Sequence, residues 1–269
     1  MAGIDLRELL HHGGTAADWQ NLGLWPASHE QQPDYAGACR ALAMRVGEAA
    51  GMQRGDRVLS LACGAGEELD LWTSAFGASE AIGLEPNIEA CAQAAHRGRH
   101  VIHGDLAGAP SKAFQRALCV DAAYHINPRR DFLQTAHRAL LPGGTLAFTD
   151  LIVDRPVDAA MRAAARACRI DPQELVDTDT AMARISTAGF TDVRCERLDE
   201  SVLDGFRHFA ALQSRRIGMR RWHSSWWPAA VTARLVLPAR ARGLGYALFS
   251  GRATGPAPCQ PSTACATLT

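Results

Sequence analysis

From Arg57 onward, short apolar runs alternate with amphipathic segments along most of the chain. The apolar runs predict buried strands, and apolar residues spaced three or four apart predict helices that pack against those strands. Such alternation is typical of βα units, in which a helix connects two parallel strands. Strands are predicted over residues 57–61, 81–84, 100–103, 118–124, 145–152, 192–198 and 244–250, the last of them at the edge of the sheet.

The helices expected between these strands follow from the same pattern. A helix through Leu69, Leu71 and Trp72 follows the first strand, and the others are predicted over residues 87–97, 128–140 and 178–188. The sequence thus predicts a domain over residues 51–252, with a lid insertion at about 201–243 that contains helical patterning. Residues 1–50 form an N-terminal helical cap segment in this interpretation, and residues 253–269 a disordered tail.

Composition limits the class of protein. The chain has 269 residues, 47% of them hydrophobic, which suits a globular fold with a substantial core. Lys and Arg together number 28, as do Asp and Glu, so no net field favours nucleic acid. The eight cysteines form no CxxC pair, and no metal site is expected. The sequence offers neither a signal peptide nor an apolar run of bilayer length, so we expect a cytoplasmic protein without stable membrane insertion.

A glycine turn directly follows the first predicted strand, in the segment Val-Leu-Ser-Leu-Ala-Cys-Gly-Ala-Gly at residues 58–66. Gly64 and Gly66 let a ligand lie against the main chain, and the helix start behind them offers free N–H groups. Glu85 ends the second strand about 20 residues later, where a carboxylate accepts hydrogen bonds from ribose hydroxyls. Asp105 ends the third strand and is expected near the amine of an adenine. The pattern predicts an adenosine-containing cofactor.

The residues after the turn indicate which cofactor this is. A dinucleotide fingerprint requires G-x-G-x-x-G, but Leu69 occupies the sixth position here. Glu67 and Glu68 stand at the helix start, where two carboxylates repel a pyrophosphate and favour a cationic ligand. S-adenosylmethionine carries a sulfonium and an ammonium group and no phosphate. The sequence therefore predicts S-adenosylmethionine, with an NAD(P)-dependent oxidoreductase as the alternative.

The order of the motifs resembles that of class I S-adenosylmethionine-dependent methyltransferases. The resemblance covers roughly residues 57–200 and rests on segments 58–66, 82–87, 104–105, 120–125 and 140–144. It implies a Rossmann-like, mostly parallel seven-stranded sheet with helices on both faces and an antiparallel last strand. It also implies that the cofactor is bound by Ser60, Ala62, Cys63, Gly64, Gly66, Glu85, Pro86, Asp105, Leu106 and Ala122.

The first strand departs from this family in two places. Ser60 stands where the family usually has an acidic residue, and Ala62 where it has a glycine. The resemblance assigns to that acid the positioning of the methionine end of the cofactor. Ser60 is able to do so only through its hydroxyl or a water molecule. A non-catalytic protein that binds S-adenosylmethionine is therefore a second alternative.

Tyr124 and His125 end the fourth predicted strand, at the edge where ligands bind in such sheets, and are the candidate catalytic residues. Methyl transfer needs proximity and orientation, and a base only if the acceptor must lose a proton. His125 has an ordinary pKa suited to a general base. A histidine that only bonds the loop or touches the cofactor fits this position as well. Tyr124 is expected to shape the pocket, and Asp150 to cap the segment after the fifth strand.

Aromatic residues outside the predicted sheet suggest the acceptor. Trp25, Tyr35, Trp222 and Trp226 are expected to line a pocket for a flat or apolar acceptor, although lid packing explains each of them as well. An Asn-x-Gly-x-Trp element at residues 21–25 is similar to that of subgroups acting on small lipophilic metabolites. We therefore expect a methyltransferase with a small-molecule acceptor and no nucleic-acid partner. The methylated atom and a homodimeric state stay open.

Overall fold

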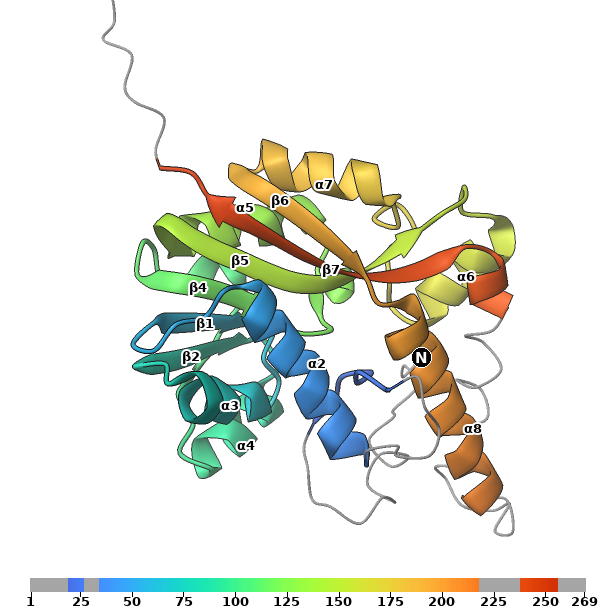
Figure 1. Ribbon diagram of the computed structural model, residues 1–269, viewed down its shortest axis with the longest axis horizontal. Coiled ribbons are helices and arrows are strands. Elements are labelled where there is room, and N and C mark those ends of the chain that lie inside the picture. The colour runs from blue at the N-terminus through green and yellow to red at the C-terminus, as the bar shows by residue number, and fades with distance from the viewer. Residues whose placement is uncertain (1–18, 27–33, 218–237, 256–269) are drawn as a thin grey trace, which may run out of the picture.

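The computed structural model describes residues 19–26, 34–217 and 238–255, and its centre is a seven-stranded sheet of order β3-β2-β1-β4-β5-β7-β6 (Figure 1). The strands are β1 (Arg57–Leu61), β2 (Glu80–Glu85), β3 (Val101–His103), β4 (Phe114–Cys119), β5 (Leu140–Val153), β6 (Phe190–Arg197) and β7 (Leu244–Ala253). Strands β1 to β5 pair in parallel, and β7 pairs antiparallel with both β5 and β6. The predicted fold class, a mostly parallel α/β sheet, is confirmed.

Helices cover both faces of this sheet (Figure 1). They are α2 (Tyr35–Ala49), α3 (Glu67–Phe76), α4 (Ile88–His96), α5 (Arg129–Ala139), α6 (Ala159–Ala167), α7 (Thr178–Thr187) and α8 (Gly205–Ile217), with short turns η2 (Leu106–Gly108), η3 (Ala123–His125) and η4 (Glu200–Asp204). Val58 of β1 packs with the apolar faces of α2 and α3. Its neighbour Leu59 packs with α5 on the other face. Because successive side chains point to opposite faces, a strand buried on both sides is continuously apolar.

β5 begins at Leu140, before its predicted start at residue 145, and two other strands differ from their predicted positions. The fourth strand was expected over 118–124, but β4 ends at Cys119. The apolar run continues beyond it, yet Asp121 takes a left-handed backbone with φ +56° and its N–H donates to Thr149 Oγ1 at 2.8 Å, so the chain leaves the sheet. The last strand, expected at the edge, lies between β5 and β6 because it pairs with both.

Helix α6 was not predicted from the sequence. Its Ala-rich segment begins after Asp158, whose carboxylate accepts a hydrogen bond from the Met161 N–H at 2.7 Å and so caps the helix. Met161 and Ala165 are its buried side chains. Because alanine carries little hydrophobic contrast, the helical period was hard to recognise. The helix is important for the site, since its buried face lines the cavity described below.

Ala62 stores backbone strain that a glycine removes. Its φ is +54°, in the left-handed region that costs a residue with a Cβ about 1–2 kcal/mol. We expect Ala62→Gly to raise the free energy of unfolding by about 0.5–1 kcal/mol, after subtraction of the extra freedom that glycine gives the unfolded chain. Urea denaturation measures this difference. The buried neighbour Ala65, whose φ is not positive, is the control, since Ala65→Gly should lower stability. Destabilisation by Ala62→Gly would show that the strain is absent.

Candidate active site

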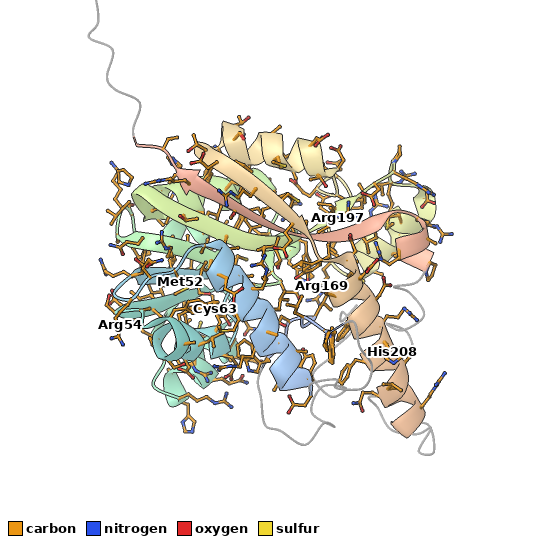
Figure 2. All side chains as sticks on the ribbon, in the orientation of Figure 1. Met52, Arg54, Cys63, Arg169, Arg197 and His208 are labelled. Atoms are coloured by element: carbon orange, nitrogen blue, oxygen red, sulfur yellow. The ribbon has the colours of Figure 1, made fainter. Side chains whose placement is uncertain are left out.

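A cavity of about 900 Å³ lies at the carboxyl ends of β1, β2 and β4. Ligands bind at this edge in open α/β sheets. The cavity walls come from the glycine turn, the segments after β2 and β4, α6 with the residues that follow it, η4, and the N-terminal segment 19–22. Figure 2 labels two lining residues from different elements, Cys63 of the glycine turn and Arg169 after α6. The volume lies within the range of about 300–1,000 Å³ that is typical of small-molecule sites.

Most of the predicted cofactor positions line this cavity. They are Ala62, Cys63, Gly64, Gly66, Glu85, Pro86 and Ala122, and the two candidate catalytic residues Tyr124 and His125 join them. Their roles toward a ligand stay predictions. The sequence therefore located this edge of the site from the glycine turn and the strand ends.

The glycine turn keeps its backbone open to the cavity. Gly64 and Gly66 have φ of +57° and +74°, which side chains rarely adopt. A Cβ built on Gly64 meets no atom within 4 Å, so a side chain there would extend into free space. A Cβ on Gly83 of β2 would lie 2.3 Å from Cys63 Sγ, and the turn therefore packs on β2 only because residue 83 is glycine.

Glu85 joins the glycine turn to the end of β2. Its Oε2 accepts a hydrogen bond from the Gly64 N–H at 2.8 Å, and its Oε1 accepts one from the Asn87 N–H at 2.9 Å. A carboxylate has about four lone-pair sites, so these two bonds leave acceptor capacity. Because Glu85 also lines the cavity, that capacity is available to hydroxyl groups of a ligand.

Glu68, in the first turn of α3, lines the cavity but was not among the predicted cofactor-binding residues. Its Oε1 accepts a hydrogen bond from Ser60 Oγ at 3.0 Å, and burial raises the pKa of its carboxyl to about 7. Ser60 itself is fully buried and does not line the cavity. In the structure the Ser60 hydroxyl bonds to Glu68, and its predicted contact with the cofactor stays a prediction. The sequence feature that could have indicated Glu68 is the pair of acidic residues, Glu67 and Glu68, at the start of this helix.

Asp121 is the second buried acid of the cavity and was also missed. Its Oδ1 accepts hydrogen bonds from the phenols of Tyr124, at 2.8 Å, and Tyr246, at 2.6 Å. Its Oδ2 accepts one from the Leu22 N–H at 2.6 Å, which ties the N-terminal segment to the cavity. Burial raises the pKa of Asp121 to about 6. The sequence feature that could have indicated Asp121 is its position just after a strand, the feature that also pointed to Glu85.

The two candidate catalytic residues lie in turn η3 and have different properties. The Tyr124 hydroxyl donates a hydrogen bond to Asp121, and burial together with that carboxylate raises the pKa of the phenol. Tyr124 therefore keeps its proton at neutral pH and serves as a wall. His125 is partly shielded from water, which lowers its pKa below 6.5, and the positive charges of Arg129 and Arg169 lower it further. His125 is accordingly neutral at physiological pH and able to accept a proton.

Some predicted site residues lie away from the cavity. Asp105 is exposed and caps η2, accepting from the Ala107 N–H at 2.9 Å, and Leu106 packs against the sheet. Trp25 and Tyr35 do not line the cavity either. Both are buried against Phe209 of α8, with ring centroids 4.8 Å and 5.6 Å from it, because α8 supplies an aromatic face that covers them. Trp222 and Trp226 lie outside the described residues.

Comparison with known proteins shows a methyltransferase domain. Residues 59–148 match the model of a methyltransferase domain. Over 219 residues, which are 72% of this chain and 69% of the relative, the chain is 26% identical to erythromycin 3″-O-methyltransferase of Saccharopolyspora erythraea. The chain is an S-adenosylmethionine-dependent methyltransferase. The predicted enzyme class and the predicted cofactor are thereby confirmed.

Solved structures agree on the fold of this methyltransferase. Phosphoethanolamine N-methyltransferase 2 of Haemonchus contortus, in complex with S-adenosyl-L-methionine, superposes with a TM-score of 0.69 at 16% identity. That alignment covers 79% of this chain and 52% of the other, so the methyltransferase spans about half the length of that relative. Geranyl diphosphate C-methyltransferase of Streptomyces coelicolor A3(2) gives 0.69 at 10% identity, over 93% and 98% of the two chains.

The residues of the cavity fit the cofactor. The glycine turn is open, Glu85 has unused acceptor capacity, and Glu68 supplies a carboxyl group. Of the described lining residues only His125 and Arg169 carry basic side chains, and neither belongs to the glycine turn, where a pyrophosphate would need compensation. When bound, S-adenosylmethionine supplies an electrophilic methyl group on a sulfonium sulfur. Within the described residues, no helix has both the length and the apolarity to cross a membrane.

Proposed function

We propose that this methyltransferase transfers the methyl group to a hydroxyl of a small apolar metabolite. The proposal rests on the cavity wall, which has a polar part and an apolar part. The wall near the glycine turn presents carboxyl groups and backbone, whereas the wall built by β5, α6, the residues after α6, η4 and the start of α8 presents mainly apolar side chains. Its apolar members are Leu151, Met161, Ala165, Ile170, Leu175, Leu203 and Phe206. An apolar wall with a few polar groups is typical of small-molecule sites. The erythromycin O-methyltransferase, by its name, acts on a hydroxyl of a small molecule.

In this mechanism the described residues position both reactants and move one proton. The glycine turn and Glu85 hold the adenosine part of the cofactor, and the apolar wall excludes water from the acceptor. The ring of His125 would accept the proton of the acceptor hydroxyl, and the bound cofactor would supply the methyl group to the acceptor oxygen. A neutral imidazole is needed for this step, which agrees with the lowered pKa of His125.

The cap over the cavity is part of the proposal. In this proposal residues 19–26 and 34–50, with residues 201–217 and 238–243 of the insertion, form a cap on the sheet domain. Their described parts support this, because Trp19 and Leu22 from the first, and Leu203 and Phe206 from the second, line the cavity. The Trp25 N–H also donates to the Ser201 carbonyl at 2.9 Å, which joins the two segments.

A mass-spectrometric screen tests the proposed acceptor class. The methyltransferase is incubated with S-adenosylmethionine and matched apolar metabolites that carry a hydroxyl, a carboxyl, an amine or no such group. Products heavier by about 14 Da, one methylene, are expected from apolar hydroxyl compounds. Methylation confined to amines or to polar acceptors would contradict the proposal.

His125→Asn tests the base with the acceptor that the screen identifies. We expect kcat to fall by about 10²–10⁴-fold, the usual contribution of general base catalysis. The wild-type rate should rise with pH to a plateau with an apparent pKa below 6.5, since the imidazole is active in its neutral form. The variant should lack that ionisation. His96→Asn, an exposed histidine in α4, is the control. An unchanged kcat and profile in His125→Asn would rule out the base.

A further inference from the structure

Glu68 has no positive partner in the described parts of the chain. Its carboxyl is buried at 8% exposure and lines the cavity, and its side-chain hydrogen-bond partner is Ser60 Oγ. The adjacent Glu67 differs completely, because it forms salt bridges to Arg97 at 2.6 Å and to Arg99 at 2.7 Å. A buried carboxylate is costly unless it is paired and hydrogen-bonded. Glu68 therefore presents an uncompensated acid to whatever fills the cavity.

We propose that Glu68, oriented by Ser60, is the group that binds the α-ammonium of S-adenosylmethionine. A carboxylate offers about four lone-pair sites, of which Ser60 uses one. The ammonium group has three N–H donors, whereas the sulfonium has none, so the ammonium is the end of the cofactor that satisfies Glu68. The N-terminus of α3 also favours a negative charge in its first turn.

This assignment explains the departure at residue 60. By resemblance, the family places an acid at the position of Ser60 to fix the methionine end of the cofactor. Here the Glu68 carboxyl, from the next helix, lies one hydrogen bond away, with Oε1 3.0 Å from Ser60 Oγ. In this chain the acidic side chain is therefore supplied by α3 instead of β1, and the hydrogen bond from the Ser60 hydroxyl orients it. The inference rests on the cofactor alone and not on the proposed acceptor.

Cofactor binding at Glu68 is linked to a proton. Burial and the negative charges of Glu67 and Glu85 raise the pKa of Glu68 to about 7, so below neutral pH the empty site holds a proton. Cys63 and Cys119 also face this carboxyl, but burial raises the pKa of each thiol and both stay neutral. An ammonium favours the ionised carboxylate and lowers its pKa. Binding therefore releases a proton, and affinity falls as the pH is lowered below 7.

Calorimetry with two ligands tests the assignment without any acceptor. S-adenosylhomocysteine carries the α-ammonium, whereas 5′-methylthioadenosine has the same adenosine and thioether but lacks the amino-acid end. At pH 7, Glu68→Gln should bind S-adenosylhomocysteine about ten- to a hundredfold more weakly, the loss of a charged hydrogen bond. Its affinity for 5′-methylthioadenosine should stay within about twofold of wild type. Asp70→Asn, an exposed acid of the same helix, should leave both affinities unchanged.

The pH dependence gives a second measurement. Wild-type affinity for S-adenosylhomocysteine should fall about tenfold between pH 7 and pH 5.5, and titrations in buffers of different ionisation enthalpy should show proton release. Glu68→Gln should lose both effects. Asp121 and His125 titrate in the same cavity, so proton release that persists in Glu68→Gln would overturn the assignment. The assignment would also be overturned if Glu68→Gln bound S-adenosylhomocysteine with wild-type affinity. It would be overturned as well if the affinities for both ligands fell equally. If the variant does not fold, wild-type proton release with S-adenosylhomocysteine but not with 5′-methylthioadenosine decides the question.

Discussion

Arg129→Met is expected to lower the free energy of unfolding by about 3–5 kcal/mol, the usual cost of breaking a buried ion pair. Arg129 is 4% exposed and forms two hydrogen bonds to Asp150, from Nε at 2.6 Å and from Nη2 at 3.0 Å. Asp150, expected from the sequence to cap the segment after its strand, instead lies within β5 and receives this guanidinium. Methionine fills the space of the arginine stem but leaves the carboxylate without a counter-charge.

Arg129 also connects stability to the site. Its Nη1 donates to the carbonyls of Ala123 and Ile126, which bracket the turn that carries Tyr124 and His125. The variant should therefore lose turnover as well as stability. This makes Arg129 a positioning residue in our account, since it does not line the cavity.

Urea denaturation at two pH values measures the effect of Arg129→Met. Without the guanidinium, Asp150 takes up a proton in the folded state, because burial already raises its pKa to about 6 in the intact pair. The folded variant then binds more protons than the unfolded chain, so its stability falls as the pH rises and the loss is larger at pH 8 than at pH 6. The double variant Arg129→Met with Asp150→Leu should recover most of the stability. A single variant within 1 kcal/mol of wild type would refute the account.

The parts of the fold that could be predicted are those with a local signal. The central strand β1 is apolar on both faces, and the glycine turn and helix α3 follow it directly. The end of β4 depends instead on the hydrogen bond from the Asp121 N–H to Thr149, which lies far along the chain. The place of β7 depends on pairing with two strands that the sequence order does not specify.

The same distinction applies to the site. Glu85 could be predicted as a residue of this edge because its spacing from the glycine turn is local, and it lines the cavity. Asp121 gains its role from Tyr246, and that hydrogen bond joins residues 125 positions apart. Trp25 was predicted to line the pocket, but its ring stacks on Phe209 of α8 and is buried in the core. Such partners are known only once the chain has folded.

Gly64→Arg is expected to abolish cofactor binding while the protein stays folded. The Cβ of residue 64 would enter open space within the cavity, so the arginine side chain would occupy the position of the ligand against the glycine turn. The left-handed backbone at φ +57° adds about 1–2 kcal/mol of strain to any residue other than glycine. Gly51→Arg is the matched control. Gly51 has a φ of +62° and an equally open Cβ position but does not line the cavity, so it carries the same strain without the blockage.

Calorimetric titration with S-adenosylhomocysteine and with NADH, on the wild type and these two variants, tests whether this cavity binds S-adenosylmethionine. We predict that the wild type and Gly51→Arg bind S-adenosylhomocysteine at one site per chain, that Gly64→Arg does not bind it, and that none of the three binds NADH. Binding of NADH by the wild type, or wild-type affinity for S-adenosylhomocysteine in Gly64→Arg, would contradict the assignment of this cavity to S-adenosylmethionine.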